Sequence, residues 1–445
     1  MSEAGNINKY ELMSTTTFTL FSRDLTTTTI HSPPNRPQST TTMHLPLPPS
    51  QSPPITREDH SLSHELLIAS LAIQRAALLT KRVLRTLETP PSPVICPSTP
   101  INGHSFFPSS PSSLHPSYNP NPNLTTRRLS IAKPDASPVT IADFAAQALL
   151  ISAIHAHFPH DSFIGEEDSS SLRADPDLCA QVWELVHSTR LEDEQAEEML
   201  GKRPESVGEM LGVIDLGCSS SPSSSQNGTG TKTKKRFWSM DPIDGTSAFL
   251  KGGQYAVSLA LIDEHGKELL GVLACPNLPL RVVMNGKKIE EGVVDKDGMG
   301  VMLSAGVVRR VNRRRSSSSR QQYQEKVRVE ELHFVDSSVS CATDSSKVEV
   351  YAAMVLGGRE YVQVRFPQKP KGEAAPWCLW DHAGSSLIYT ESGAGKVTDL
   401  EGKQIDFGTG RKLTNNWGLI TADESVHGKI LELVGEVLGD GKKQE

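Results

Sequence analysis

The spacing of apolar residues divides the chain into segments that can bury one face and segments that cannot. From Leu62 to Leu87, apolar residues recur every three or four positions, which predicts an amphipathic helix with Arg75 and Lys81 among its polar positions. The helix is expected to end at Thr89, because two prolines follow. The ordered part of the chain is therefore predicted to begin near residue 61.

A second helix is expected to start near Thr140. Thr140 and Asp143 have the three-residue spacing of a capping box, and an apolar run follows them. A short apolar run at 162–164 then predicts a strand, which leads into the sequence G-E-E-D at 165–168. A further helical pattern opens at Asp175, just ahead of a proline. The acidic tetrad is therefore expected on a loop between a strand and a helix.

The middle of the chain carries signals for strands. Residues 237–240 predict a strand that runs directly into the hexapeptide D-P-I-D-G-T at 241–246. The runs 255–263 and 268–275 predict two strands joined as a hairpin around His265. Strands that alternate with helices predict an α/β or layered α+β fold.

Composition separates the folded part of the chain from low-complexity segments. Only 37% of the 445 residues are hydrophobic, and 33 glycines and 30 prolines accompany long runs of Ser and Thr. Residues 1–60 have a composition that cannot repay the entropy of ordering, so we expect a disordered tail there. Further low-complexity inserts are expected near 89–130, 219–235 and 311–324. The rest of the chain is long enough for the core of an ordinary globular enzyme.

The charge balance and the cysteines narrow the classes of function. Lys and Arg number 45 against 52 Asp and Glu, a net charge of −7, which argues against partners such as nucleic acid or an anionic membrane. Six scattered cysteines have no zinc-binding spacing and are too sparse for a disulfide framework, as is typical of a reducing compartment. With neither a long apolar segment nor a signal peptide, we expect a soluble, cytoplasmic protein. Organellar targeting by the N-terminal tail is the open alternative.

The hexapeptide at 241–246 is the sharpest chemical signal. The carbonyl of Ile243 lies between the carboxylates of Asp241 and Asp244, and Gly245-Thr246 permits a tight turn that could meet a phosphate. Such hard oxygen ligands suit Mg²⁺. The alternative is a β-turn in which the aspartates cap backbone amides, and the hexapeptide alone favours neither reading.

Three other acidic residues are candidates, and each has a structural alternative. Glu166 and its neighbours could simply favour the dipole of the following helix. Asp143 could serve only as the third residue of the capping box. Asp381 follows a tryptophan and precedes small residues, so it could be a helix N-cap or a ligand at a close-packed helix start.

The order of the acidic motifs changes this balance, because together they resemble a known family. The sequence resembles the inositol monophosphatase superfamily of Mg²⁺-dependent, lithium-sensitive phosphatases in its helix-start Asp143, its Glu pair at 166–167, D-P-I-D-G-T at 241–246 and W-D-H-A-G at 380–384. Within the superfamily, K-P-D-A-S-P-V-T at 133–140, A-Q at 146–147 and D-F-G-T-G-R at 406–411 are similar to the 3'(2'),5'-bisphosphate nucleotidases.

This resemblance implies the layered αβαβα sandwich of the inositol monophosphatase and fructose-1,6-bisphosphatase type. The catalytic domain would span 61–440, with an N-terminal α+β half at 61–263 that carries most metal ligands and a C-terminal α/β half at 264–440. The implied reaction is removal of the 3'(2')-phosphate of adenosine 3',5'-bisphosphate to give AMP and phosphate. The implied biology is sulfate assimilation, and the 5'-phosphosulfate form is a further implied substrate.

The resemblance also implies roles for individual residues. Two or three Mg²⁺ ions would be bound by Glu166, Asp241, the Ile243 carbonyl, Asp244 and Asp381, and would activate a water and neutralise phosphate charge. Asp143 and Thr246 would orient the attacking water. The amides of Gly245, Thr246 and Ser247 would hold the phosphate, and Arg365 and Lys347 would bind the nucleotide.

One departure from the family leaves alternatives open. The region from Phe334 to Tyr351 looks shortened, and it should help enclose the nucleotide; counted back from Arg365, Tyr351 takes the place of Lys347. The first alternative is therefore a phosphatase of the same superfamily that acts on inositol phosphates. The second is a catalytically impaired member that binds phosphate ligands. In each case we expect a monomer with a small-molecule partner.

Overall fold

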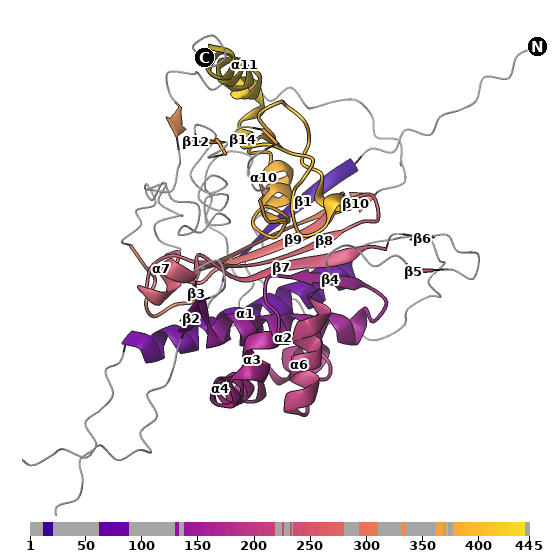
Figure 1. Ribbon diagram of the computed structural model, residues 1–445, viewed down its shortest axis with the longest axis vertical. Helices are drawn as coiled ribbons and strands as arrows, with labels where there is room; N and C mark the ends of the chain where they lie inside the picture. Colours follow the sequence, from indigo (N-terminus) through magenta and orange to yellow (C-terminus); the bar gives the residue numbers. More distant parts are fainter. Residues whose placement is uncertain are drawn as a thin grey trace, which may run out of the picture.

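The computed structural model describes residues 62–88, 138–218, 235–279, 293–309, 361–367, 371–372 and 377–440, together with short segments at 12–20, 130–132, 225–226, 232–233 and 332–334. The chain folds into alternating layers of helices and sheets (Figure 1). None of the helices in these ranges combines the length and the apolar character that crossing a membrane requires.

The first layer consists of helices α1 (Ser63–Glu88) and α2 (Ile141–His157), which pack against each other and against one face of the large sheet. Helix α2 lies between β7 of that sheet and the outer helices α4 (Pro176–Ser188) and α6 (Val207–Leu216). Every residue of α2 from Ile141 to Ile154 is buried, because the helix has neighbours on all sides. The predicted start of this helix is confirmed, and Thr140 and Asp143 form the capping box.

Two basic residues of α1 differ from expectation. Arg75 and Lys81 are buried, with exposed fractions of 0% and 2%, although their spacing predicts a polar face. Arg75 forms an ion pair with Glu197 at 3.1 Å, and Lys81 donates to Asn277 Oδ1 at 2.5 Å. The periodicity of one helix cannot reveal that partners on other elements will cover its polar positions and satisfy the charges.

The large sheet has the strand order β1-β10-β9-β8-β7-β4. Its strands are β1 (Leu12–Leu20), β4 (Ser162–Gly165), β7 (Phe237–Asp244), β8 (Ala256–Ile262), β9 (Glu268–Cys275) and β10 (Val301–Arg309). The predicted hairpin around His265 is confirmed as β8 and β9. Strands β4 and β7 pair in parallel, with Gly165 opposite Met240, so the loops that follow the two strands leave the sheet side by side.

The remaining layers come from the C-terminal part of the chain. Helix α10 (Ser385–Glu391) packs on β9 and β10 and also contacts β13 of a second sheet. The order of the second sheet is β11-β12-β14-β13, formed by β11 (His333–Phe334), β12 (Tyr361–Arg365), β14 (Leu419–Ala422) and β13 (Lys396–Thr398). Helix α11 (Glu424–Asp440) covers β14. The order helix, sheet, helix, sheet, helix in Figure 1 confirms the predicted layered α/β class.

Short elements complete the described chain. They are the helices α3 (Ser170–Ala174), α5 (Glu194–Met199) and α7 (Thr246–Leu250), the 3-10 helix η2 (Phe407–Thr409), and the paired strands β2 (Ser130–Ala132) with β3 (Pro138–Thr140) and β5 (Ser225–Gln226) with β6 (Lys232–Thr233).

Two features of the large sheet lie close to segment boundaries expected from the sequence. Residues 12–20, expected to lie in a disordered tail, form β1 and pair with the outer edge of β10, where unpaired backbone groups accept another strand. The expected division of the domain at 263/264 falls inside the β8–β9 hairpin, whose strands share one sheet. The second sheet begins only after β10, because backbone pairing holds the hairpin together regardless of where the acidic residues lie.

Candidate metal and phosphate site

Asp241 and Asp244 lie at the end of β7, and an irregularity in the strand lets them face the same space. Side chains three positions apart in a regular strand point to opposite faces. The pairing of β7 with β8 shifts register between Asp241 and Asp244, which turns the second carboxylate toward the first. Both side chains are almost fully buried, with exposed fractions of 2% and 6%.

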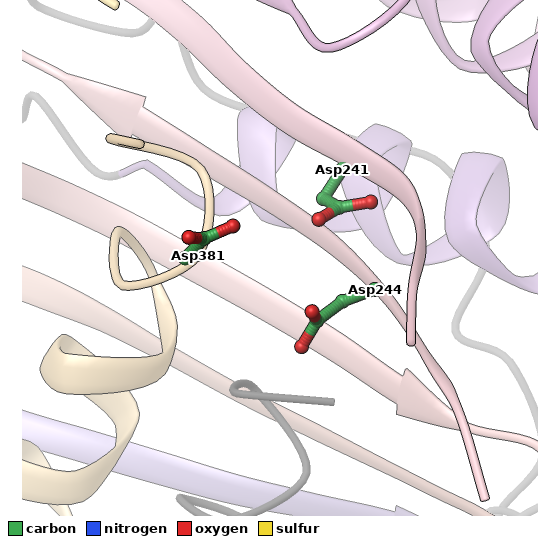
Figure 2. Close-up of side chains that lie close together, drawn as sticks. All are labelled: Asp241, Asp244 and Asp381. Atoms are coloured by element: carbon green, nitrogen blue, oxygen red, sulfur yellow. The ribbon is translucent and has the colours of Figure 1, made fainter. Parts of the chain in front are cut away.

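Asp381 completes the group from a distant part of the chain. It lies in the turn ahead of α10 and is 4% exposed. One carboxylate oxygen from each of Asp241, Asp244 and Asp381 lies within 4.8 Å of the others. Figure 2 shows the three side chains turned toward a common space, two from β7 and one from the turn. Such a group of buried hard oxygens fits a divalent cation like Mg²⁺.

Two glycines allow the turn at Asp381 to lie flat on the sheet. Gly384 has a φ of 81°, in the left-handed region that glycine favours. A Cβ on Gly271 of β9 would lie 2.6 Å from Cα of Gly384, closer than packed atoms approach. The close contact of these two backbones therefore fixes how far Asp381 stands from the sheet.

The electrostatics of the group favour a bound cation. Burial raises the pKa of Asp241 well above its usual value, and the negative charges of Glu166, Asp244 and Asp381 raise it further. Carboxylates crowded in this way repel one another when they are ionised. A divalent cation would relieve both the repulsion and the cost of burial, so the residues present fit the metal that the sequence predicts.

Glu166 lies beside this group because β4 and β7 pair in parallel. Gly165, the last residue of β4, pairs with Met240 of β7. Glu166 and Asp241 are the next residues on the two strands, so they lie at equivalent positions. The charge of Glu166 contributes to the raised pKa of Asp241, which places the two carboxylates near each other. The next residue, Glu167, is held by Gln147, whose side-chain oxygen accepts from the Glu167 amide at 2.9 Å and whose nitrogen donates to the Glu167 carbonyl at 2.7 Å.

Asp143 forms the helix cap with one carboxylate oxygen and faces Thr246 with the other. Its Oδ2 accepts hydrogen bonds from the Thr140 amide at 2.8 Å and the Thr140 hydroxyl at 2.6 Å, as a capping residue does. Its Oδ1 faces Thr246, whose hydroxyl oxygen lies 3.3 Å away. The same hydroxyl lies 3.0 Å from the carbonyl oxygen of Ile243. Because the hydroxyl has one hydrogen, it donates to only one of these oxygens at a time.

The turn at Gly245 connects the strand to the short helix α7. Gly245 has a φ of 90°, so a residue with a side chain would be strained there. Gly245, Thr246 and Ser247 are partly exposed, while Asp241 and Asp244 beside them are buried. The backbone at this turn therefore offers an accessible edge next to the acidic group.

The structure describes one of the two predicted nucleotide-binding residues, Arg365. Arg365 lies on β12, and its guanidinium carbon is 5.5 Å from the centre of the Trp377 ring. The Trp377 ring in turn lies 5.3 Å from that of His382, the residue after Asp381. Lys347 lies outside the described residues.

Two residues that support the site carried no predicted role. Gln147 and Arg411 both hold the loop after β4, although the sequence marked them only as parts of the motifs A-Q and D-F-G-T-G-R. Their spacing gave no sign of what they contact, because their partners are backbone carbonyls of distant segments. Only their membership of these motifs could have indicated that the two residues support the site.

The layered fold defines an α/β protein, and its buried acidic group fits a divalent cation. Residues 121–438 match the inositol monophosphatase family, and the chain belongs to that family. The resemblance seen in the motifs is thereby confirmed.

Curated relatives refine this assignment. A protein of Emericella nidulans named 3'(2'),5'-bisphosphate nucleotidase is 33% identical over 407 residues, which cover 85% of this chain and 99% of the relative. A Schizosaccharomyces pombe protein of the same name is 34% identical over 337 residues, or 69% of this chain and 86% of the relative. A protein of Arabidopsis thaliana named 3',5'-bisphosphate nucleotidase 2 is 32% identical over 324 residues, or 68% and 87%.

Proposed function

We propose that the protein is a Mg²⁺-dependent phosphomonoesterase that removes the 3'(2')-phosphate of adenosine 3',5'-bisphosphate and releases AMP and phosphate. The observation that carries the proposal is the buried group formed by Asp241, Asp244 and Asp381, whose oxygens lie within 4.8 Å of one another. The names of the relatives, which share most of their length with this chain, support the substrate.

The residues of the site divide into two groups by role. Glu166, Asp241, Asp244, Asp381 and the carbonyl of Ile243 would hold Mg²⁺. When bound, Mg²⁺ lowers the pKa of a coordinated water, neutralises phosphate charge and stabilises the leaving oxygen. No nucleophilic side chain is then needed.

Asp143 and Thr246 orient the attacking water. The capping hydrogen bonds at Oδ2 fix the carboxylate of Asp143, which leaves Oδ1 to accept the hydrogen of the Thr246 hydroxyl. The lone pairs of that hydroxyl can then accept a hydrogen bond from the water. The amides of Gly245, Thr246 and Ser247 bind the phosphate at the accessible edge of the site.

Phosphate release from adenosine 3',5'-bisphosphate tests the proposal. We expect release that depends on Mg²⁺ and that falls to background in Asp241→Asn and Asp244→Asn. Asp177→Asn serves as the matched control, because Asp177 is an exposed aspartate in the first turn of α4. Full activity of either site variant would refute the metal assignment.

A comparison substrate tests specificity in the same assay. Inositol 1-phosphate, assayed at the same concentrations, should be cleaved with a lower kcat/KM than the nucleotide. The reverse preference would assign the protein to the inositol phosphate phosphatases of the family. Absence of release from both substrates by folded, Mg²⁺-loaded protein would instead indicate an impaired, ligand-binding member.

A further inference from the structure

Arg411 contacts both segments that bring ligands to the acidic group from outside β7. Its Nη1 donates to the carbonyl oxygens of Gly165 at 2.7 Å and Gly217 at 3.2 Å. Its Nη2 donates to the carbonyl oxygen of Glu166 at 3.1 Å. The guanidinium carbon also lies 4.6 Å from the centre of the Trp380 ring, the residue next to Asp381. One side chain thus spans the loop after β4 and the turn ahead of α10.

The backbone of Arg411 holds the same turn. The amide of Leu379 donates to the carbonyl oxygen of Arg411 at 3.0 Å. Arg411 is set in place by the 3-10 helix before it, where the Asp406 carboxylate accepts from the Gly408 amide at 2.9 Å and Gly410 adopts a φ of 96°. Local hydrogen bonds therefore fix the backbone of the segment that carries Arg411, and its side chain contacts the loop after β4 and the turn ahead of α10.

The chemistry of arginine suits this position. A guanidinium group is planar and offers several N–H donors in a fixed geometry, so it can bind carbonyls of two segments while its face covers an aromatic ring. Glu166 follows the end of a strand, where the sheet no longer fixes the backbone. Metal ligands must be held within about 0.5 Å of the productive geometry, and that precision comes from the residues behind them.

We propose that Arg411 is a positioning residue that fixes Glu166 relative to Asp381 and thereby sets the affinity of the site for divalent cations. In this role Arg411 acts through the Glu166 carbonyl and the Trp380 ring. The inference rests on the metal site of the proposed function but not on the identity of the substrate.

Binding of Mn²⁺ to the full-length protein, measured from the electron paramagnetic resonance signal of the free ion, provides a test that does not require turnover. Arg411→Lys keeps the positive charge but loses the planar set of N–H donors, and Arg411→Ala loses both. We expect each variant to raise the Kd for Mn²⁺ by about 10- to 100-fold, the range found when residues behind metal ligands are replaced. Guanidinium chloride at a non-denaturing concentration should restore part of the affinity of Arg411→Ala, and NaCl of equal ionic strength should not.

Arg236→Lys is the matched control. Arg236 also lies over an aromatic ring, 5.5 Å from the centre of Phe158, and it also binds acidic partners, Asp161 and Glu65. It stands before β7, at the end opposite Asp241, so its variant should bind Mn²⁺ like the wild type. Activity gives a second readout: excess Mg²⁺ should restore kcat in Arg411→Lys, with little change in the KM for the nucleotide.

Wild-type affinity for Mn²⁺ in a folded Arg411→Lys protein would overturn the proposal. An Arg411→Ala protein that does not fold would leave the decision to Arg411→Lys, whose melting temperature without metal is measured alongside. Failure of the proposed function would give a different result. A wild type that binds Mn²⁺ but releases no phosphate would refute the proposed function, while the comparison of Mn²⁺ affinities would still test the role of Arg411.

Discussion

Replacement of Glu268 by glutamine is expected to raise the free energy of unfolding at pH 8 and to leave it nearly unchanged at pH 4.5. Glu268 opens β9 and supports the turn after Asp381. Its Oε1 accepts hydrogen bonds from the Gly384 amide at 2.7 Å and the Ser386 hydroxyl at 2.9 Å. Burial nevertheless raises the pKa of Glu268 to about 7, and the charge of Glu391 adds to this effect.

The size and sign of the effect follow from linkage. The folded protein holds the proton of Glu268 more tightly than the unfolded chain, whose carboxyl has a pKa of 4.5. The stability that this proton contributes is complete below pH 4.5 and is lost as the pH rises through 7. The difference between the two pKa values corresponds to about 3 kcal/mol. Since the side chain is partly exposed, solvent screening reduces the expected effect to about 1–2 kcal/mol.

Glutamine can retain both hydrogen bonds at Oε1 but carries no charge at any pH. Urea unfolding followed by tryptophan fluorescence at pH 4.5 and pH 8 would give the difference in free energy between variant and wild type. Glu264→Gln, in the exposed turn of the same hairpin, is the control and should show no such pH dependence. An equal difference for Glu268→Gln at both pH values would show that the ionisation of Glu268 does not affect folding.

Three further predictions concern the site itself. Without metal, Asp241→Asn should be at least as stable as the wild type, because burial and neighbouring charges raise the pKa of Asp241. Mg²⁺ at 100 times its Kd should stabilise the wild type by about 2.7 kcal/mol. The variant should lose this stabilisation, which thermal unfolding would measure. Thr246→Val should lower phosphate release by about 10²- to 10⁴-fold, whereas Thr246→Ser should keep most of it; equal rates would remove the hydroxyl from the reaction. Gly271→Ala should cost about 1–3 kcal/mol in urea unfolding and weaken Mg²⁺ binding, because its Cβ would push Gly384 and the adjoining turn away from the sheet; an unchanged Mg²⁺ affinity would show that the turn tolerates the shift.

Asp241 and Asp143 show why the sequence allowed both a structural and a chemical interpretation of its aspartates. Asp241 Oδ1 accepts from the Ile243 amide at 3.1 Å, as the turn reading requires, while its carboxylate also belongs to the buried acidic group. Asp143 likewise uses one oxygen for the helix cap and presents the other to Thr246. A carboxylate has two oxygens, so the structural and the chemical reading were never exclusive alternatives.

The sequence by itself determined the local elements and the kinds of residue at the site. The capping box at Thr140, the hairpin around His265 and the strand into D-P-I-D could all be predicted, because caps, turns and alternation depend on neighbouring residues. The ordered set of acidic motifs was also sufficient to predict the family.

Only the tertiary structure decided which residues meet. Glu166, Asp241 and Asp381 come together through the parallel pairing of β4 with β7 and the packing of the turn ahead of α10 on the sheet. The contact between Arg411 and Gly165 spans 246 positions, and the burial of Arg75 and Lys81 depends on partners from other elements. The hydrophobic periodicity of a segment indicates which of its faces is buried, but not which distant residues cover that face. The convergence of distant side chains depends on backbone pairing and close packing between segments, which no local pattern encodes.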